Sequence, residues 1–372
     1  MDSLQKTIFI VAGEPSGDIH GAKLISAIKK VQPNISFIGH GGNQMAVAGG
    51  TIIEHIDRLA IMGFSEVIQH MPRMIRIMRE TITAIKRIKP DGIILIDYPG
   101  FNLHLAKKIR KQNIPISYFI LPQAWAWKEK RVEIMKTTLD QALSIFPFEK
   151  EWFESRGLPT KFIGHPFVER KPIKENRDSF LKRHSLDPNN PIITLLPGSR
   201  QQEVNQHWPI FLKTFDQLHK KVPLLQVVVG KAPNITLKPL PDYINVEVDA
   251  RLAMAYGTVA ITSSGTATLE CALEGIPSVV CYRLSFYSWV ILKLLANVPH
   301  VSMVNLIADK RVVPELIQYN MTPDNIVNNI MPLFDDQSPE RKNILTGYEN
   351  VRQSLGNPGV YERAAKAIIK RL

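Results

Sequence analysis

Residues 7–18, Thr-Ile-Phe-Ile-Val-Ala-Gly-Glu-Pro-Ser-Gly-Asp, decide the fold class of this chain. The apolar, β-branched start predicts a buried strand, and the turn residues that follow lead into a helical pattern over residues 20–31. A strand that is apolar on both faces is typical of a parallel sheet covered by helices. The stretch therefore predicts the first strand-turn-helix unit of an α/β domain.

The same pattern recurs along the chain, with helix-period segments between the apolar runs. Further buried strands are predicted at residues 92–96, 115–120, 142–146, 192–196, 225–229, 259–262 and 278–281. Residues 164–177 combine glycine, proline and basic residues with few apolar ones, as expected of an interdomain linker. The sequence thus predicts two doubly wound, Rossmann-like α/β domains, with ligand-binding loops at the carboxyl ends of the strands.

The composition of the chain indicates which binding partners and which cellular compartment to expect. The 372 residues carry 46 Lys and Arg against 34 Asp and Glu, a net charge of +12, which favours nucleic acid, anionic lipid or phosphorylated substrates without choosing among them. Cys271 and Cys281 lie in a predicted helix and strand, so we expect no disulfide framework and a cytosolic protein. The N-terminal apolar run is too short for a signal peptide, and no run reaches the roughly 18 residues of a spanning helix.

The loop after the first strand contains Glu14, Ser16 and Asp18. Its glycines allow a ligand to approach the backbone, and its two acids favour a hydroxyl or amine over a phosphate. An equally good interpretation is a capped turn in which Ser16 or Asp18 is the N-cap of the helix.

Asp97 follows an almost wholly apolar predicted strand. An ionised side chain there needs partners or a cleft, so Asp97 is our candidate general base. A carboxylate near its usual pKa of about 3.9 is a weak base, so this role requires a raised pKa or a hydrogen-bonded reactant. The alternative is a structural aspartate that caps the turn before Pro99.

Two indoles, Trp125 and Trp127, follow the strand predicted at 115–120. Beside Lys128, Lys130 and Arg131 they would form an apolar wall with a basic rim. On residue type alone, ordinary core aromatics are the favoured interpretation.

Two glycine- and hydroxyl-containing turns follow strands of the second half. In the first, Gly198, Ser199 and Arg200 offer backbone N–H groups, a hydroxyl and a fixed positive charge, which suit a diphosphate. The second comprises residues 263–270, where Glu270 lies one turn into a helix and is placed to accept from ribose hydroxyls. Together they predict a nucleoside diphosphate site.

The chain has no Asp-x-Asp motif and no Cys/His cluster, so we expect neither a metal nor a cofactor.

Residues 71–89 form an amphipathic pattern with basic residues opposite an apolar face. That face comprises Met71, Met74, Ile75, Met78, Ile82, Ile85 and Ile88. A helix of this kind lies in a membrane interface or, alternatively, packs on its own sheet. A second apolar stretch, within residues 286–295, adds to the membrane interpretation.

Together these motifs closely resemble those of the lipid A disaccharide synthase family, whose members are glycosyltransferases of the GT-B architecture. The matching segments, in family order, are Gly13-Glu14-x-Ser16-Gly17-Asp18, Ile96-Asp97-x-Pro99-x-Phe101-Asn102, Trp125-Ala126-Trp127, Gly164-His165, Leu196-Pro197-Gly198-Ser199-Arg200, Ser264-Gly265-Thr266-Ala267-x-Leu269-Glu270 and Asn305.

The resemblance implies two Rossmann-like domains that face each other across a cleft, with residues 1–167 binding the acceptor and 168–340 binding the donor. It implies transfer of a diacylglucosamine unit from a UDP carrier to a diacylglucosamine 1-phosphate, with inversion. Asp97 would be the base, and the acceptor side would include Glu14, Ser16, Asp18 and Asn102. The implied UDP site comprises Gly198, Ser199, Arg200, Ser264, Gly265, Thr266, Glu270 and Asn305.

The resemblance also implies a homodimer that acts in the cytoplasm at the anionic surface of the inner membrane and binds no nucleic acid. The helical segment 341–372 would pack outside its own second domain or exchange between subunits. Gly100 and Gln123 depart from the family pattern, which commonly has a second acid and a serine there. Two alternatives stay open: another UDP-sugar enzyme of this architecture, such as an epimerase, and a non-catalytic basic protein that binds lipid or nucleic acid.

Overall fold

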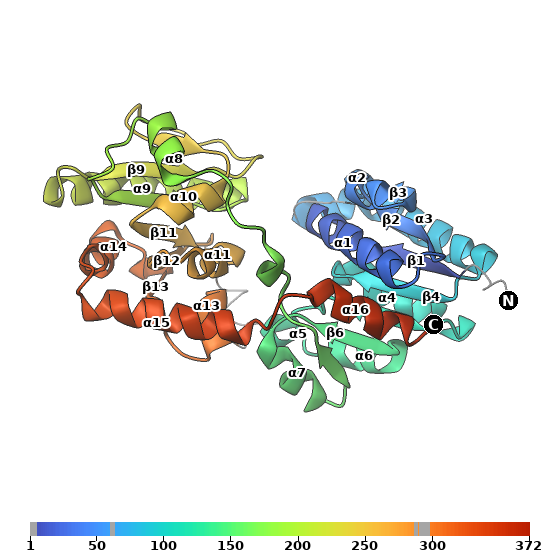
Figure 1. Ribbon diagram of the computed structural model, residues 1–372. Coiled ribbons are helices and arrows are strands. Elements are labelled where there is room, and N and C mark those ends of the chain that lie inside the picture. Colours follow the sequence, from blue (N-terminus) through green and yellow to red (C-terminus); the bar gives the residue numbers. More distant parts are fainter. Residues whose placement is uncertain (1–5, 60–63, 286–288, 290–297) are drawn as a thin grey trace. The chain divides into compact units, whose positions relative to one another are not determined.

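The computed structural model describes residues 6–59, 64–285, 289 and 298–372. The chain divides into two α/β units, each built on one parallel sheet (Figure 1). The first unit contains Met1–Arg170 and Leu355–Leu372, and the second contains Lys171–Ser354. The predicted fold class, two doubly wound parallel-sheet domains, is confirmed.

The first unit has a seven-stranded sheet in the order β3-β2-β1-β4-β5-β6-β7. Its strands are β1 (Thr7–Val11), β2 (Ser36–Gly41), β3 (Gly50–His55), β4 (Gly92–Ile96), β5 (Ile116–Phe119), β6 (Gln141–Ser144) and β7 (Thr160–Phe162). The strand order runs outward in both directions from the neighbouring pair β1 and β4. In doubly wound sheets of this kind, the loops after the two strands of the central pair are the usual place for a ligand, at the carboxyl edge.

Helices cover both faces of this sheet. They are α1 (Pro15–Val31), α2 (Asn43–Val47), α3 (Phe64–Ile88), α4 (Pro99–Ile109), α5 (Ala124–Trp127), α6 (Arg131–Thr138), α7 (Pro147–Glu154) and α16 (Val360–Ile369), with 3-10 turns η1 (Ile56–Arg58), η2 (Arg110–Gln112) and η3 (Pro166–Glu169). Alternate strand residues such as Phe9 and Leu95 pack against α3, α4 and α6, and Ile96 contacts α1 on the other face. Burial on both faces explains the continuous apolar runs.

The chain returns to the first unit at its C-terminal end, where α16 lies beside α1 (Figure 1). The Glu169 carboxylate accepts from the Val360 N–H at 2.6 Å, and Tyr361 Oη lies 2.8 Å from His20 Nδ1. The unit boundary thus falls at Arg170, three residues beyond the expected one. The expected segment 341–372 is divided, because α15 (Pro339–Ser354) belongs to the second unit.

The second unit has a six-stranded sheet in the order β10-β9-β8-β11-β12-β13. Its strands are β8 (Ile192–Leu196), β9 (Gln226–Gly230), β10 (Asn245–Glu247), β11 (Val259–Ser263), β12 (Ser278–Tyr282) and β13 (Glu315–Ile317). Its helices are α8 (Arg177–Arg183), α9 (Gln201–Lys221), α10 (Ala250–Tyr256), α11 (Thr266–Glu274), α13 (Met303–Ala308), α14 (Pro323–Ile330) and α15, with η4 (Gln318–Asn320) and η5 (Met331–Phe334). Here the central pair is β8 and β11.

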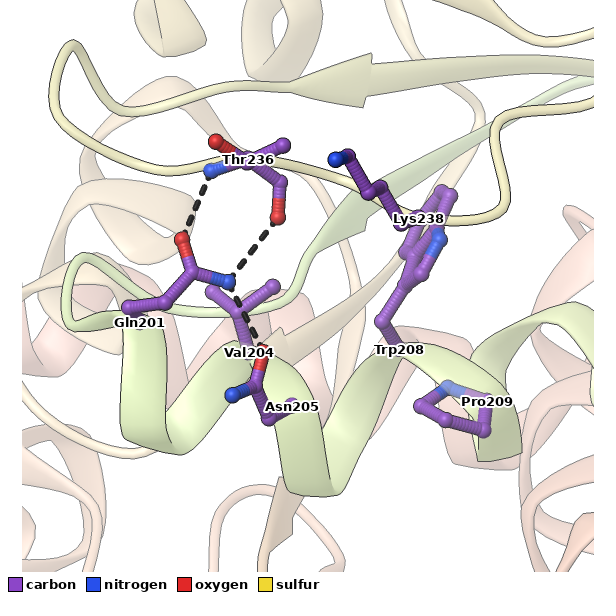
Figure 2. A pocket seen from close by; sticks show the side chains of 7 residues that line it. All are labelled: Gln201, Val204, Asn205, Trp208, Pro209, Thr236 and Lys238. Atoms are coloured by element: carbon purple, nitrogen blue, oxygen red, sulfur yellow. Dashed lines mark hydrogen bonds between the residues drawn. The ribbon is translucent and has the colours of Figure 1, made fainter.

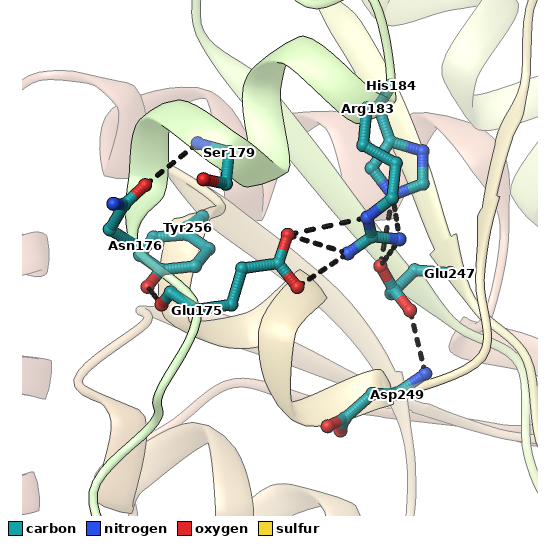
Figure 3. Close-up of polar contacts among 8 residues, drawn as sticks. All are labelled: Glu175, Asn176, Ser179, Arg183, His184, Glu247, Asp249 and Tyr256. Carbon is teal, nitrogen blue, oxygen red and sulfur yellow. Dashed lines mark hydrogen bonds and ion pairs between the residues drawn. The ribbon is translucent and has the colours of Figure 1, made fainter.

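A polar cluster ties α8 to β10 in the second unit (Figure 3). The buried Glu247 carboxylate accepts from Arg183 at 2.7 Å and from the Asp249 N–H at 2.9 Å, and lies 3.0 Å from His184 Nε2. Arg183 also binds Glu175, at 3.0 Å, in the chain that leads into α8. A buried carboxylate with three polar partners is a structural anchor.

The amphipathic helix α3 buries only part of its predicted apolar face. Met74, Met78, Ile82, Ile85 and Ile88 pack against the core. Met71 and Ile75, nearer the start of the helix, are exposed. The second apolar stretch, within residues 286–295, lies outside the described residues except Trp289. Among the residues that the structure describes, no helix has the length and hydropathy needed to cross a bilayer.

Candidate active site

Asp97 lies in a turn at the carboxyl end of β4 whose backbone is held by neighbouring groups. Asp97 and Tyr98 both have positive φ, +43° and +48°, which is unfavourable for residues with a Cβ. The Asp97 carbonyl accepts from Asn102 Nδ2 at 2.7 Å and from the Tyr118 hydroxyl at 2.5 Å. Asn102 is wholly buried. These hydrogen bonds fix the direction in which the Asp97 side chain leaves the strand.

Burial raises the pKa of Asp97 to about 6, and the negative charge of Glu14 adds to this effect. A hydrogen bond from the Tyr98 backbone and the charge of Arg131 oppose it. The requirement for a base that works near neutral pH is therefore met by desolvation and a like charge.

The loop after β1 meets the Asp97 turn directly. A Cβ on Gly13 would lie 2.2 Å from the Tyr98 ring, so only glycine fits there. Glu14 and Ser16 are exposed, whereas Asp18 is 4% exposed. The Asp18 carboxylate accepts from the N–H groups of Gly42 (2.7 Å), Gln44 (3.0 Å) and Met45 (3.0 Å) and so caps α2. The N-cap of α1 is Glu14, so neither Ser16 nor Asp18 has that role.

The two indoles differ in their surroundings. Trp125 is buried, and its Nε1 donates to Glu149 at 3.0 Å. Burial raises the pKa of Glu149 to about 7, against the hydrogen bonds from Trp125 and two backbone N–H groups. Trp127 is 46% exposed, with Lys128 and Arg131 beside its ring. Thus Trp125 is a core aromatic and Trp127 forms the apolar surface with a basic rim.

In the second unit, the turn after β8 needs glycine. Gly198 has φ +125°, and a Cβ there would lie 3.0 Å from Glu203 Oε2 and 3.6 Å from Ser263 Oγ, so the two predicted turns are neighbours. Ser199 is exposed, and the Arg200 side chain is 78% exposed, 3.2 Å from Glu203. The arginine is therefore accessible to an anionic ligand.

The turn after β11 is open. Gly265 has φ +113° with no atom within 4 Å of a Cβ position, and Thr266 is exposed. The Ser264 hydroxyl donates to the Val301 carbonyl at 2.9 Å, and Glu270 is partly buried on α11. The backbone at Gly265 has free space into which a ligand could approach closely.

Asn305 is wholly buried and its amide is fully used by the protein. Its Oδ1 accepts from the N–H groups of Val312 (2.8 Å) and Val313 (2.9 Å). Its Nδ2 donates to the Val313 carbonyl at 3.0 Å and to Glu315 at 2.8 Å. Asn305 could therefore affect a ligand only by holding the backbone of residues 312–313 in place.

A pocket of about 450 Å³ lies along α9 (Figure 2). It begins one residue after Arg200, with Gln201, and no motif in the sequence predicts it. Gln201 donates to Asn205 at 2.8 Å and to the Thr236 carbonyl at 2.9 Å, and accepts from the Thr236 N–H at 2.7 Å. Gln201 thus joins the Asn205 side chain to the backbone of Thr236. In the part of the chain that the structure describes, no cluster of His, Cys, Asp and Glu could hold a metal.

Comparison with known proteins identifies the family. The family model for lipid-A-disaccharide synthetases matches residues 8–370. The chain belongs to this family. It is 35% identical to the lipid-A-disaccharide synthase of Myxococcus xanthus, over 98% of this chain and 97% of the relative, and 38% identical to that of Acidobacterium capsulatum, over 95% and 92%. As a member of the family it is a glycosyltransferase, as expected from its motifs.

Solved structures of other proteins share the fold of this lipid-A-disaccharide synthetase family member. A UDP-N-acetylglucosamine 2-epimerase from Listeria monocytogenes, described as putative in its title, has a TM-score of 0.64 at 12% identity, over 99% of this chain and 95% of its own. The glycotransferase of kitacinnamycin has a TM-score of 0.64 at 14% identity and covers both chains completely. At this identity the likeness shows the fold alone.

Proposed function

We propose that this glycosyltransferase forms the lipid A disaccharide by transferring a diacylglucosamine unit from UDP to the hydroxyl of a diacylglucosamine 1-phosphate. Family membership supports the overall reaction. The observation that carries the mechanism is the partly buried turn at Asp97, which combines a fixed backbone with a pKa raised to about 6. A carboxylate with such a pKa is mostly ionised at neutral pH and yet a better base than an exposed aspartate.

In this mechanism Asp97 takes the proton of the acceptor hydroxyl. The oxygen forms a bond with the anomeric carbon of the donor while the bond from that carbon to the diphosphate oxygen breaks. UDP leaves with the electron pair, and attack from the opposite side inverts the anomeric centre. Glu14, whose charge raises the pKa of Asp97, and Ser16 are both exposed and would contact the acceptor. Asn102 acts by holding the backbone of Asp97, and Asp18 acts by holding the start of α2.

The donor is assigned to the second unit. Arg200 would bind the diphosphate with the N–H groups of Gly198 and Ser199, and the start of α11 adds Ser264, Gly265 and Thr266. Glu270 would accept from the ribose hydroxyls, and Asn305 would contribute through the segment that it holds. An arginine and backbone amides neutralise the leaving group without a bound cation.

Metal independence follows from this assignment and is a direct test of it. We expect the rate of UDP release to be unchanged by an excess of EDTA. Loss of activity in EDTA that Mg²⁺ restores would contradict the proposed role of Arg200.

The test of the mechanism is Asp97→Asn, measured by UDP release with the acylated donor and acceptor. We expect turnover to fall by about 100-fold or more while UDP binding is unchanged. Asp57→Asn, at an exposed position in the same unit, is the matched control and should leave turnover unchanged. An unaltered rate in Asp97→Asn removes Asp97 from the reaction.

Equal turnover of UDP-N-acetylglucosamine without acyl chains would instead favour a different UDP-sugar enzyme.

We also propose that the enzyme works in the cytoplasm, bound peripherally to the anionic surface of the inner membrane, and that it binds no nucleic acid. The exposed Met71 and Ile75 on the basic helix α3 support membrane binding. A homodimer with exchanged C-terminal segments remains a prediction from the resemblance. Sedimentation at the mass of one chain would contradict it.

A further inference from the structure

A basic pair surrounds the exposed indole of Trp127. Lys128 Nζ lies 4.2 Å from the centroid of the Trp127 ring, and Arg131 Cζ lies 5.3 Å from it. Lys128 is exposed and Arg131 is half-buried. Partial desolvation lowers the pKa of both side chains, and the charge of Arg131 lowers that of Lys128 further. Two positive charges are therefore held close enough to repel each other.

The carboxylates nearest to Lys128 and Arg131 in the sequence form ion pairs with other residues. Glu129 pairs with Arg156 at 2.6 Å, and Glu133 pairs with Lys136 at 3.1 Å. Among the described residues, neither Lys128 nor Arg131 forms an ion pair with a carboxylate. Repulsion between two cations that are not ion-paired is unfavourable in the free protein, and an anionic ligand bound by both would relieve it.

This pair lies at the same edge of the sheet as Asp97. Trp127 ends α5 and Arg131 begins α6, in the segment after β5, which is the neighbour of β4. The Asp97 N–H donates to the Phe119 carbonyl at 3.1 Å, so the two strand ends are joined. Arg131 is near enough to Asp97 for its charge to lower the pKa of that carboxyl. A base and a cationic pair thus lie within reach of one ligand.

We propose that Lys128 and Arg131 bind the phosphate of the acceptor sugar, with the face of Trp127 as an apolar contact beside it. This assignment rests on the proposed function, because it places the acceptor next to Asp97. An anchored phosphate would orient the sugar so that its hydroxyl meets the carboxylate. The guanidinium of Arg131 offers the two-point hydrogen bonding that a phosphate prefers, and Lys128 adds a point charge.

The test removes the charge from the protein and the phosphate from the substrate in turn. Arg131→Gln and Lys128→Gln are assayed in detergent micelles with the acylated sugar 1-phosphate and with its dephosphorylated counterpart. With the phosphorylated acceptor we expect kcat/KM to fall by about 10- to 100-fold, through KM for the acceptor. With the dephosphorylated acceptor, assayed at a pH well above the pKa of Asp97, wild type and variants should be alike, in transfer or in competitive inhibition. KM for the donor should not change.

The matched control is Lys136→Gln, which removes one charge from the same helix α6 and should leave both acceptors unaffected. Arg131→Lys should restore part of the loss, because it keeps the charge and loses the two-point geometry. Equal losses on both acceptors would overturn the assignment. So would unchanged acceptor kinetics together with weaker binding to phosphatidylglycerol vesicles, which would make the pair a membrane contact. Absence of transfer by the wild type would instead refute the proposed function.

Discussion

At the scale of single residues, Asp97 shows how a fold can adjust the basicity of a carboxylate. Its pKa is raised first by burial and then by Glu14, and lowered by the Tyr98 backbone and Arg131. The groups that shift it come from three different loops at one edge of the sheet. Because two of these are charged side chains, their removal should shift the pKa of Asp97 in opposite directions.

The pH dependence of kcat/KM tests this arrangement. Asp97 must be ionised to accept a proton, so activity should fall as the pH drops through about 6. Glu14→Gln removes a negative neighbour and should move this acid limb to lower pH, whereas Arg131→Gln should move it to higher pH. Glu133→Gln, whose carboxylate pairs with Lys136, serves as the control and should leave the limb in place. A limb that does not move in either variant would show that another group titrates.

At the scale of elements, buried side chains fix the segments that carry the site. Asn305 binds backbone groups of residues 312–313, and Glu315 accepts from the Ser302 N–H at 2.8 Å at the start of α13. Asp18 likewise accepts from a backbone N–H group at the start of α2. In each case the polar group satisfies backbone N–H groups that would otherwise be buried without partners. Such residues therefore fix the shape of the loops that they bind.

The anchor of α8 on β10 makes a prediction about stability. Glu247→Gln should lower the free energy of unfolding by about 1–3 kcal/mol at pH 7, because the buried carboxylate loses charge-assisted hydrogen bonds from Arg183 and His184. These hydrogen bonds hold the pKa of Glu247 below its usual value against the effect of desolvation, so its contribution is present above about pH 4.5 and is lost as the pH falls. Urea unfolding at several pH values measures both effects.

Glu175→Gln is the matched control, since Glu175 binds the same Arg183 from a more exposed position. Its loss should be about 1 kcal/mol or less. Equal losses in the two variants would show that burial of Glu247 does not matter to the cluster.

At the scale of the whole molecule, each unit is a complete doubly wound sheet with a central pair of strands, and α16 completes the first unit although it is last in the sequence. Residues that the sequence separates by more than 300 positions, such as His20 and Tyr361, are hydrogen-bonded in one unit. The net charge of +12 belongs to the whole chain and favours an anionic surface.

Membrane binding is the prediction that belongs to this scale. The double variant Met71→Asp, Ile75→Asp should bind vesicles of phosphatidylglycerol and phosphatidylcholine about tenfold or more weakly, because it replaces two exposed apolar side chains with acids. Val47→Asp, at another exposed apolar position of the same unit, is the control and should bind nearly as well as the wild type. Equal vesicle binding by wild type and double variant, measured by co-sedimentation, would remove α3 from the membrane contact.

The fold was predicted well because central strands of a parallel sheet are apolar throughout. All eight predicted strands are present, and β1, β4, β8 and β11 among them lead into the loops of the candidate site. Five strands were missed: β2, β3, β7, β10 and β13. Four of these are the edge strands of the two sheets. An edge strand is short or half exposed, so its sequence lacks the continuous apolar run that identifies a central one.

The candidate site was predicted less completely. Asp97 and the glycine turns could be found because a charge after an apolar strand, or a glycine between strand and helix, is visible in the sequence. The roles of Tyr118 and Glu149 were missed. Each is buried and is recognised only by its partner, the Asp97 carbonyl for Tyr118 and the Trp125 indole for Glu149. Pro147 and Glu149 just after β6 were the one available signal, since strand ends carry function in such sheets.

The sequence by itself determined the fold class, the family and the positions of the loops, because these depend on local patterns of apolar and turn residues. The tertiary structure decided which polar side chains are used inside the protein and which remain exposed. Asp18, Asn102 and Asn305 turn inward because buried backbone groups require hydrogen-bond partners, whereas Arg200 remains largely exposed. That choice depends on the neighbours of each side chain in space, and no pattern along the chain specifies them.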